Sequence, residues 1–472
     1  MTIAEIAAKN EYNYGHMTIG ECIAVAAESG MTVGEVILTE ACDVTGKSKE
    51  DIAASMEEAF DHNLCAAKIG VEDGSSFLLG SVGQDLTKEN APMIVEDAFV
   101  NKIVAYTLAA QVGNHSIGLR PCAGTGDSCP YTGFIKALKE DYDDADLIAR
   151  IMAVILKIGG EFRIGKATTG CNMEGFGAGA AATAAAFVEL AGGTPGQMET
   201  AMVLALSPTI SVPCTPRVLV PGLCATHIGG GILIARLASQ LAMHTTVPTN
   251  VPIDVMIAMA AQCHLASAKH IVPITIDYME PFFKHNEKVD AYISDEIKAE
   301  EQARQKALIK KATEESRQLA NKSNPITAPF GEAVVGGSSL GVGSPTNCAR
   351  IAHFLAKGEV KKVKIELYAE MFARRAINVP GILMAAVDGH GTSNAEAYRD
   401  SLDVARQKGV EVEILEIPEH SIQRVTIEAT EGNSMVESVN SGGARLILKD
   451  AYPSIERARE IAKELNIVII DE

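Results

Sequence analysis

The chain has 472 residues, of which 47% are hydrophobic and 21% are charged. This composition predicts a globular protein of about two domains and excludes a disordered chain or a mini-protein. The 60 acidic and 41 basic side chains give a formal net charge of −19. They disfavour nucleic-acid binding, because no cluster of Lys and Arg is present to neutralise phosphates.

The start of the chain has no features of a signal peptide. Residues 1–20 carry Glu5 and Lys9 and lack a basic start followed by an apolar core, so we expect a cytoplasmic protein. The most apolar stretch, residues 178–191, contains Glu189 and at about 14 residues is too short to cross a membrane. The ten cysteines have no regular spacing. They predict reduced thiols that could ligate a metal or a cluster, and no disulfide framework.

Residues 1–285 are predicted to form a helical domain, because their apolar residues recur at three- and four-residue spacing between Gly-rich breaks. Two helix starts are readable. Thr32 is followed by Glu35, and Ser48 by Asp51, each just before an apolar run. This pattern is typical of an N-cap with an acidic side chain in the first turn.

Residues 286–324 contain sixteen charged side chains, eight of each sign, which predicts a long solvated helix linking two domains. Residues 325–472 alternate short β-branched runs with helical stretches and predict a smaller α/β domain with a mixed sheet. The expected strands cover 363–368, 410–417, 425–429 and 446–449. A helix is expected over 396–408 and a turn at Gly442 and Gly443.

Three cysteines stand where the helical pattern breaks. Cys171 follows Gly170, Cys214 follows Pro213, and Cys224 follows Pro221-Gly-Leu. Three thiolates could hold a 4Fe–4S cluster and leave one iron open as a Lewis acid for catalysis. The alternative is three buried free cysteines, since Cys is among the most buried residue types. Spacing alone favours that alternative.

Two further segments could bind a small acid. Residues 120–130 read Arg-Pro-Cys-Ala-Gly-Thr-Gly-Asp-Ser-Cys-Pro and could present amides to a carboxylate beside Arg120. The alternative there is a tight interhelical loop. Ser338 and Ser339 lie in a Gly-rich run, and His390 lies between glycines. Such a His could act as an acid or a base, and the alternative is a turn His.

Together these segments resemble the iron–sulfur-dependent L-serine dehydratases. Residues from about 31 to 56 resemble the opening of the α-part of that family, and Gly170-Cys-Asn-Met-Glu174 resembles its Gly-Cys-x-x-Glu element. Residues 212–224 resemble its two later cluster cysteines. Residues from about 331 to 449, with Gly389-His-Gly-Thr392, look like the β-part. The chain would then be an α–β fusion.

The resemblance implies a lyase that eliminates water or another β leaving group from a small amino or hydroxy acid. Cys171, Cys214 and Cys224 would hold a 4Fe–4S cluster. The resemblance also implies a small carboxylate substrate, a cytoplasmic enzyme and a possible homodimer. The remaining site residues are expected to be Ser338, Ser339 and His390 for catalysis and Arg120, Gly124, Thr125 and Gly126 for substrate binding.

The sequence departs from the family pattern at the substrate element. The family has Gly-Pro-Ser-Ser-Ser-His-Thr, and this chain has Leu340, Gly341 and Val342 in place of the last three residues. Losing several hydrogen-bonding groups changes which substrate binds, so the exact substrate stays open. Two alternatives also stay open, a non-catalytic cluster-binding sensor and a zinc protein. The general base is open among His390, His227 and Glu174.

Overall fold

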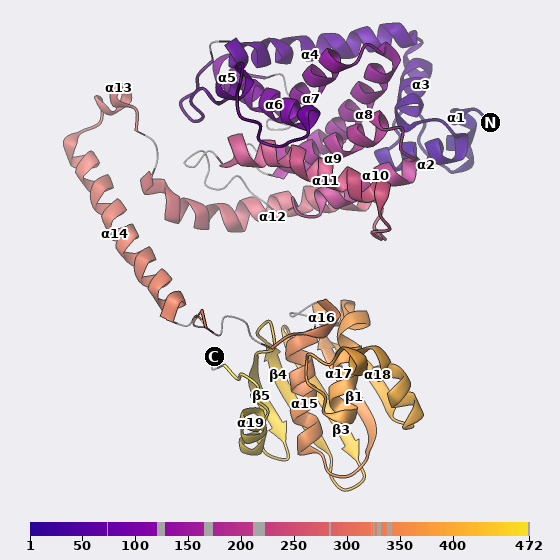
Figure 1. Ribbon diagram of the computed structural model, residues 1–472, viewed down its shortest axis with the longest axis vertical. Coiled ribbons are helices and arrows are strands. Elements are labelled where there is room, and N and C mark those ends of the chain that lie inside the picture. The colour runs from indigo at the N-terminus through magenta and orange to yellow at the C-terminus, as the bar shows by residue number, and fades with distance from the viewer. Residues whose placement is uncertain are drawn as a thin grey trace. The chain divides into compact units, whose positions relative to one another are not determined.

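The computed structural model describes residues 1–72, 74–119, 128–164, 173–210, 222–282, 285–321, 323, 326–327, 332–337 and 342–470. The chain divides into two compact units, Met1–Glu314 and Glu315–Glu472. Each unit has its own hydrophobic core. Figure 1 shows helices in the first unit and a sheet with helices in the second. The predicted fold class, a helical part followed by a smaller α/β part, is therefore confirmed.

The first unit is built from helices alone in its described residues. They are α1 (Ile3–Lys9), α2 (Ile19–Ser29), α3 (Val33–Thr45), α4 (Lys49–Glu72), α5 (Val82–Thr87), α6 (Ala98–Ile117), α7 (Ser128–Asp141), α8 (Ala145–Ile164), α9 (Met173–Leu190), α10 (Pro195–Leu206), the π-helix η1 (Gly222–His227), α11 (Ile228–His244), α12 (Ile253–Met279), the 3₁₀ helix η2 (Glu280–Phe282), α13 (Glu287–Asp290) and α14 (Asp295–Asn321), which runs on into the second unit.

Side-chain caps mark the helix starts that the sequence predicts. The Thr32 hydroxyl accepts a hydrogen bond from the Glu35 amide, and the Glu35 carboxylate accepts one from the Thr32 amide. The Ser48 hydroxyl accepts from the Asp51 amide at 3.1 Å. Such caps bond amides that have no partner inside the helix, so both predicted starts are confirmed.

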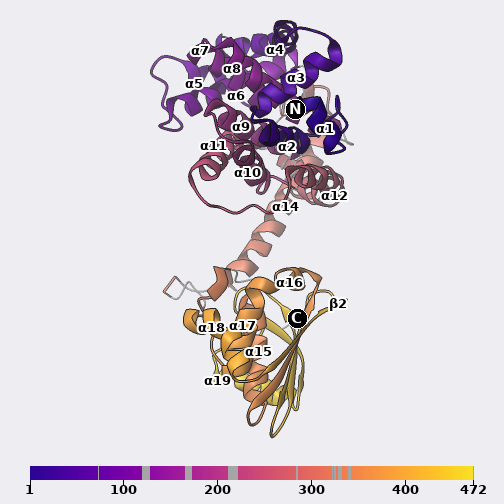
Figure 2. The ribbon, with the colours of Figure 1, turned by 90° about the vertical axis from the view of Figure 1, so that its right-hand side faces the viewer.

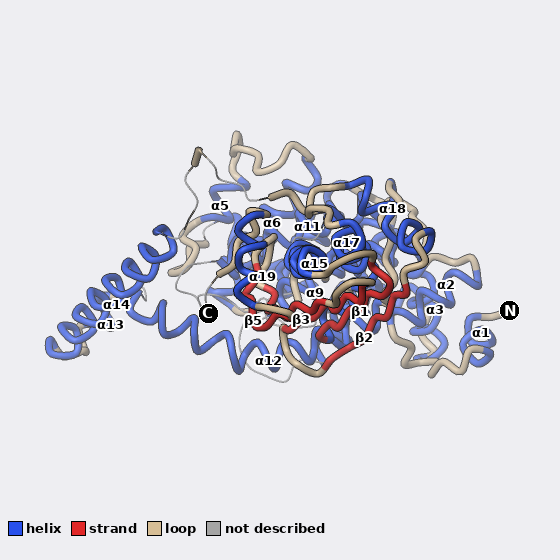
Figure 3. Tube along the Cα trace, turned by 90° about the horizontal axis from the view of Figure 1, so that it is seen from below, coloured by secondary structure: helices blue, strands red, loops and turns tan. Residues whose placement is uncertain are grey.

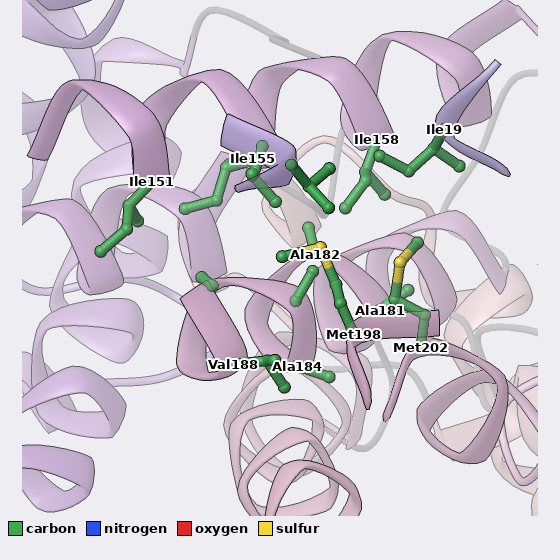
Figure 4. Packing of buried hydrophobic residues seen from close by; sticks show 14 of the residues in the cluster. Ile19, Ile151, Ile155, Ile158, Ala181, Ala182, Ala184, Val188, Met198 and Met202 are labelled. Atoms are coloured by element: carbon green, nitrogen blue, oxygen red, sulfur yellow. The ribbon is translucent and has the colours of Figure 1, made fainter. Parts of the chain in front are cut away.

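Small side chains let the central helices pack closely. Ile155 and Ile158 of α8 point toward Ala182 of α9, and Met198 and Met202 of α10 fill the space beside them (Figure 4). All five side chains are buried. The apolar stretch 178–191 thus lies mostly in α9, inside the core of this unit. Among the described residues, no single helix is long and apolar enough to span a membrane, although the bent pair of α2 and α3 passes that test together.

The charged stretch forms α13 and α14, and none of the residues of α14 is buried. Its charges are paired locally, as between Lys298 and Asp295 at 3.6 Å. An exposed helix of this kind owes its solubility to its charged faces.

The second unit contains a five-stranded mixed sheet in the order β2-β1-β3-β4-β5. Its strands are β1 (Val360–Tyr368), β2 (Glu411–Ile417), β3 (Ile422–Ala429), β4 (Ser434–Asn440) and β5 (Leu446–Tyr452). Its helices are η3 (Val335–Gly337), α15 (Ser344–Leu355), α16 (Ala369–Ala373), α17 (Arg375–Asp388), α18 (Ala395–Gln407) and α19 (Ile455–Glu464). Strand β1 pairs in parallel with β2, and the other pairs are antiparallel. Helices α15, α17 and α19 cover one face of the sheet (Figures 2 and 3).

The sequence predicts four of these strands and misses β4. Ser434 and Ser438 of β4 point to the buried face of the sheet, where Ser438 accepts a hydrogen bond from Gln423 of β3 at 3.1 Å. Buried serines hide the alternation of apolar and polar residues that identifies a strand. The turn predicted at Gly442 and Gly443 lies between β4 and β5, and both glycines have positive φ.

Candidate functional site

Most of the predicted site residues lie outside the described residues. These are Arg120, Gly124, Thr125, Gly126, Cys171, Cys214, Ser338 and Ser339. Cys224 lies on η1, with its side chain outside the described part. His390 is described in full. The geometry of the site therefore rests on the elements that flank these segments and on His390.

The elements that flank the cysteine segments meet at one end of the helical unit. Cys129 at the start of α7 packs with Ala110 of α6 and with Ile228, the first residue after η1. A Cβ added to Gly179, near the start of α9, would lie 2.9 Å from Pro130 of α7. The helices that lead out of 120–127, 165–172 and 211–221 are thus neighbours, although these segments are far apart in sequence.

Helices α4 and α6 approach each other closely beneath this end. A Cβ at Gly70 of α4 would come within 1.9 Å of the Ala109 carbonyl oxygen, and one at Gly113 of α6 within 1.9 Å of the Ala66 carbonyl oxygen. Glycine is required at both crossing points because no larger side chain fits between the backbones. The close packing holds His62 of α4 at 2.7 Å from the carbonyl oxygen at the C-terminal end of α6.

A polar network occupies the last turns of α6. The Oε1 atom of Gln111 accepts hydrogen bonds from the Cys129 thiol at 2.7 Å and from the Asn114 amide at 3.4 Å. The Nε2 atom of Gln111 lies 3.2 Å from Nε2 of His115. The Oδ1 atom of Asn114 accepts from the Leu119 amide at 2.8 Å. Gln111 and Cys129 are both buried, Asn114 is half-buried and His115 is exposed, so this network runs from the interior to the surface.

Two histidines lie at this end, His115 with an exposed side chain and His227 with a half-buried one. The pKa of His115 and the pKa of His227 are both lowered by desolvation, because burial disfavours the charged imidazolium. His227 ends η1, three residues after Cys224. A π-turn is often found at functional sites. A neutral imidazole can accept a proton, so these side chains can serve as bases at pH 7.

In the second unit, His390 follows the C-terminal end of α17. Gly389 adopts positive φ and ends the helix, and the His390 amide bonds the Met384 carbonyl at 3.3 Å. The Nδ1 atom of His390 lies 3.3 Å from the side-chain amide nitrogen of Asn394, whose oxygen caps α18. Arg350 donates to the Gly389 carbonyl at 3.2 Å. Nδ1 of His390 is therefore positioned as an acceptor.

The structure brings the His390 loop beside the run that leads to Ser338. The Thr392 hydroxyl donates to the Ala333 carbonyl at 2.8 Å, and the Val335 amide donates to the Thr392 carbonyl at 2.8 Å. A cavity of about 240 Å³ adjoins His390 between α17 and α18. Two segments that the sequence marks separately are thus held together by backbone hydrogen bonds.

The sequence analysis did not identify Gln111, Asn114, His115 or His62 as site residues. The available signal was the polar run Asn114-His115-Ser116, a few residues before Arg120. Within the described residues, no group of three or more His, Cys, Asp or Glu side chains is arranged to hold a metal ion.

Comparison with known proteins concerns the first unit. A family model described as the serine dehydratase alpha chain matches residues 28–271. The Bacillus subtilis (strain 168) protein named "Probable L-serine dehydratase, alpha chain" is 28% identical over 258 residues, which cover 51% of this chain and 82% of that protein. The family match contains the three cysteines and the polar network at the end of α6.

Proposed function

The chain belongs to the serine dehydratase alpha-chain family, and from this premise we propose that it eliminates water from L-serine or a closely related small acid. Membership implies a serine-dehydratase-like lyase. The finer proposal is that Cys171, Cys214 and Cys224 hold a 4Fe–4S cluster. The observation that supports it is that the helices flanking the cysteine segments pack against one another at one end of the helical unit.

The donor set fits such a cluster. Three cysteines supply the thiolates that iron–sulfur clusters require, and three ligands are what a catalytic cluster with an open iron needs. Helix α9 begins at Met173, two residues after Cys171, and a helix start favours a nearby negative charge. When bound, the cluster supplies a Lewis-acidic iron that stabilises the charge on a leaving oxygen.

The chain itself must take the proton from the α-carbon. We assign this role to the imidazole of His227, because burial keeps it neutral and it lies three residues from Cys224. The C–H electron pair forms the new C=C bond as the C–O bond breaks, and the hydroxide that leaves becomes water by taking up a proton, for which the imidazolium of His227 is the source. The resulting 2-aminoacrylate hydrolyses to pyruvate and ammonia.

In the first unit, Arg120 and the amides of residues 124–126 are proposed to bind the carboxylate. In the second unit, Ser338, Ser339 and His390 are proposed as catalytic residues. Val342, where the family has Thr, is fully buried. A Cβ at Gly381 of α17 would touch it at 2.6 Å. The valine thus packs against α17 at Gly381.

The test uses the anaerobically purified full-length chain. We expect a brown protein that contains iron and sulfide and releases pyruvate and ammonia from L-serine. Cys171→Ser is expected to lose both the cluster and the activity. The matched control Cys65→Ser, at an exposed cysteine of α4, is expected to retain both. Retention of iron by Cys171→Ser would contradict the cluster assignment.

The same experiment separates the alternatives. A protein that contains the cluster but turns over none of a panel of small amino and hydroxy acids would favour the sensor over the lyase. Zinc in place of iron would exclude the 4Fe–4S cluster and favour a zinc protein. His227→Gln that retains iron but loses turnover would support the assigned base, and full activity in that variant would overturn it.

A further inference from the structure

Within the described residues of the second unit, one face of the sheet is not covered by a helix. Helices α15, α17 and α19 pack on the other face (Figure 3), and α16 follows the end of β1 directly. Successive side chains of a strand point to opposite faces of a sheet, so each of the five strands contributes side chains to this uncovered face. We call it the open face.

Apolar side chains form a row across all five strands of the open face. Tyr368 of β1 pairs with Ile417 of β2, and the antiparallel register of β1 and β3 puts Tyr368 beside Ile422. Val439 of β4 pairs with Ile422 of β3 and with Ile447 of β5. In β3 and β4, the residues that alternate with this row are buried under the helices. The aliphatic members of the row are half-buried, and a continuous apolar row on an uncovered face indicates a partner.

Beside the apolar row lies a set of charged side chains that is neutral as a whole. Arg424 of β3 donates to Glu437 of β4 at 2.6 Å and to Glu366 of β1 at 3.2 Å. Lys364 lies 3.2 Å from Glu366, so two cations balance two anions. Such a set gives little specific attraction to a nucleic acid or to a strongly charged peptide. A neutral protein surface can cover it, because each charge keeps its partner.

The open face is complementary to itself. A two-fold axis that is parallel to the strands and passes between β3 and β4 lays the apolar row of one copy on that of the other, with Val439 opposite Ile422. The same axis places Arg424 opposite Glu437 in both directions, so that opposite charges face each other. Sheets of the same twist pack face to face about 10 Å apart. A second copy of the chain therefore matches both parts of the face.

The edges of the sheet are poorer sites for a second copy. Antiparallel pairing of two β2 strands would bring Glu411, Glu413 and Glu416 close to the same carboxylates of the other copy, which is unfavourable. The β5 edge is partly occupied, because the Ile470 amide donates to the Leu446 carbonyl at 3.0 Å. The open face is thus the better surface for self-association.

We propose that a second copy of this chain docks on the open face through the apolar row and forms a weak homodimer. With about 4.8 Å between strands and about 3.3 Å per residue, four overlapping strands of about seven residues cover about 440 Å² in each copy. A total of about 900 Å² is at the small end of protein interfaces and predicts a dissociation constant in the micromolar range. No residue of the open face belongs to the proposed active site, so this proposal is independent of the proposed function.

Sedimentation of the full-length chain between about 1 and about 200 μM tests the proposal. We expect a monomer–dimer equilibrium in the wild-type protein. Val439→Lys is expected to raise the Kd of the dimer at least about tenfold, because the dimer would bury the added ammonium twice. The control is Leu402→Lys, at a leucine of α18 that is 54% exposed, which should dimerise like the wild type. A wild-type protein that stays monomeric throughout, or equal Kd values for the two variants, would overturn the proposal.

A fluorescence experiment keeps the row apolar and decides the question even if Val439→Lys does not fold. The chain contains no Trp, so Ile447→Trp introduces a single reporter on the open face. Its emission should shift to shorter wavelength as the concentration rises through the Kd, because dimerisation removes the ring from water. Leu402→Trp should show no such shift. Emission at short wavelength from a monomer at every dilution would mean that another part of the same chain covers the face, which also contradicts the proposal.

Discussion

Several titratable side chains meet where α2, α3, α8 and α12 come together. Glu40 accepts hydrogen bonds from two backbone amides before α2, and Asp254 accepts from Thr18 and Gly20. Lys157 lies 4.0 Å from Glu40 and 3.8 Å from Glu161. Glu161 is half-buried, and its Oε1 atom accepts no hydrogen bond.

Glu161 is therefore the carboxylate of this cluster whose ionised form is least well stabilised. Its pKa is raised from 4.5 to about 7, chiefly by burial and also by Asp254 and Glu21, although Lys157 and the Ile19 amide oppose the increase. A group that binds its proton more tightly in the folded state stabilises that state at low pH. This contribution to the free energy of unfolding is lost as the pH rises from about 4.5 to about 7. Above that range the ionised carboxylate destabilises the folded state.

We predict that Glu161→Gln stabilises the protein at pH 8 and has little effect at pH 4.5. The expected gain at pH 8 is about 1–3 kcal/mol, because the variant has no carboxylate to ionise. Urea unfolding at the two pH values measures it. Glu58→Gln, at an exposed glutamate of α4, is the control and should show no such difference. A loss of stability in Glu161→Gln at pH 8 would mean that the Lys157 ion pair outweighs desolvation.

At the scale of elements, α4 and α6 cross with their backbones in close approach. Gly70 and Gly113 each lie where a Cβ would touch the backbone of the other helix. Near the crossing, His62 of α4 lies 2.7 Å from the Gly118 carbonyl oxygen at the end of α6. The backbone packing and this polar contact are thus parts of one interface.

We predict that Gly113→Ala destabilises the first unit by about 2 kcal/mol or more, because the methyl group overlaps the Ala66 carbonyl and forces the helices apart. Gly160→Ala in α8 is the matched control. Nothing lies within 4 Å of its new Cβ, so this variant should be stabilised by about 0.5–1 kcal/mol. Equal effects in the two variants would show that the crossing tolerates a methyl group.

At the scale of the whole molecule, the two units have separate cores. The first core is formed by helices, and the second lies between the sheet and its covering helices. The boundary between the units falls within α14, which has no buried residue. Units with separate cores joined by an exposed helix are expected to unfold in separate transitions.

We predict that Gly343→Ala destabilises the second unit alone. A Cβ at this position would lie 2.1 Å from the Gly443 carbonyl oxygen, and such an overlap costs about 2 kcal/mol or more. Calorimetry should show two transitions, of which Gly343→Ala lowers one and Gly113→Ala the other. Amide exchange assigns each transition to its unit. A single transition lowered by both variants would mean that the two units unfold together.

The sequence alone determined the helix starts and the charged stretch before the α/β unit. A Thr32–Glu35 cap joins residues three apart, and the charge pattern of 286–324 is local. It also marked the cysteine segments, through their Gly and Pro neighbours. Such features can be read directly because the interacting groups lie close together in the chain.

Only the tertiary structure decided which side chains meet. Gln111 contacts Cys129, eighteen residues away, because the packing of α7 against α6 brings them together. The buried hydroxyl of Ser438 accepts a hydrogen bond from Gln423 on the neighbouring strand. Neither pair has a local pattern, since a buried polar side chain is stabilised by a partner that the fold supplies from elsewhere in the chain.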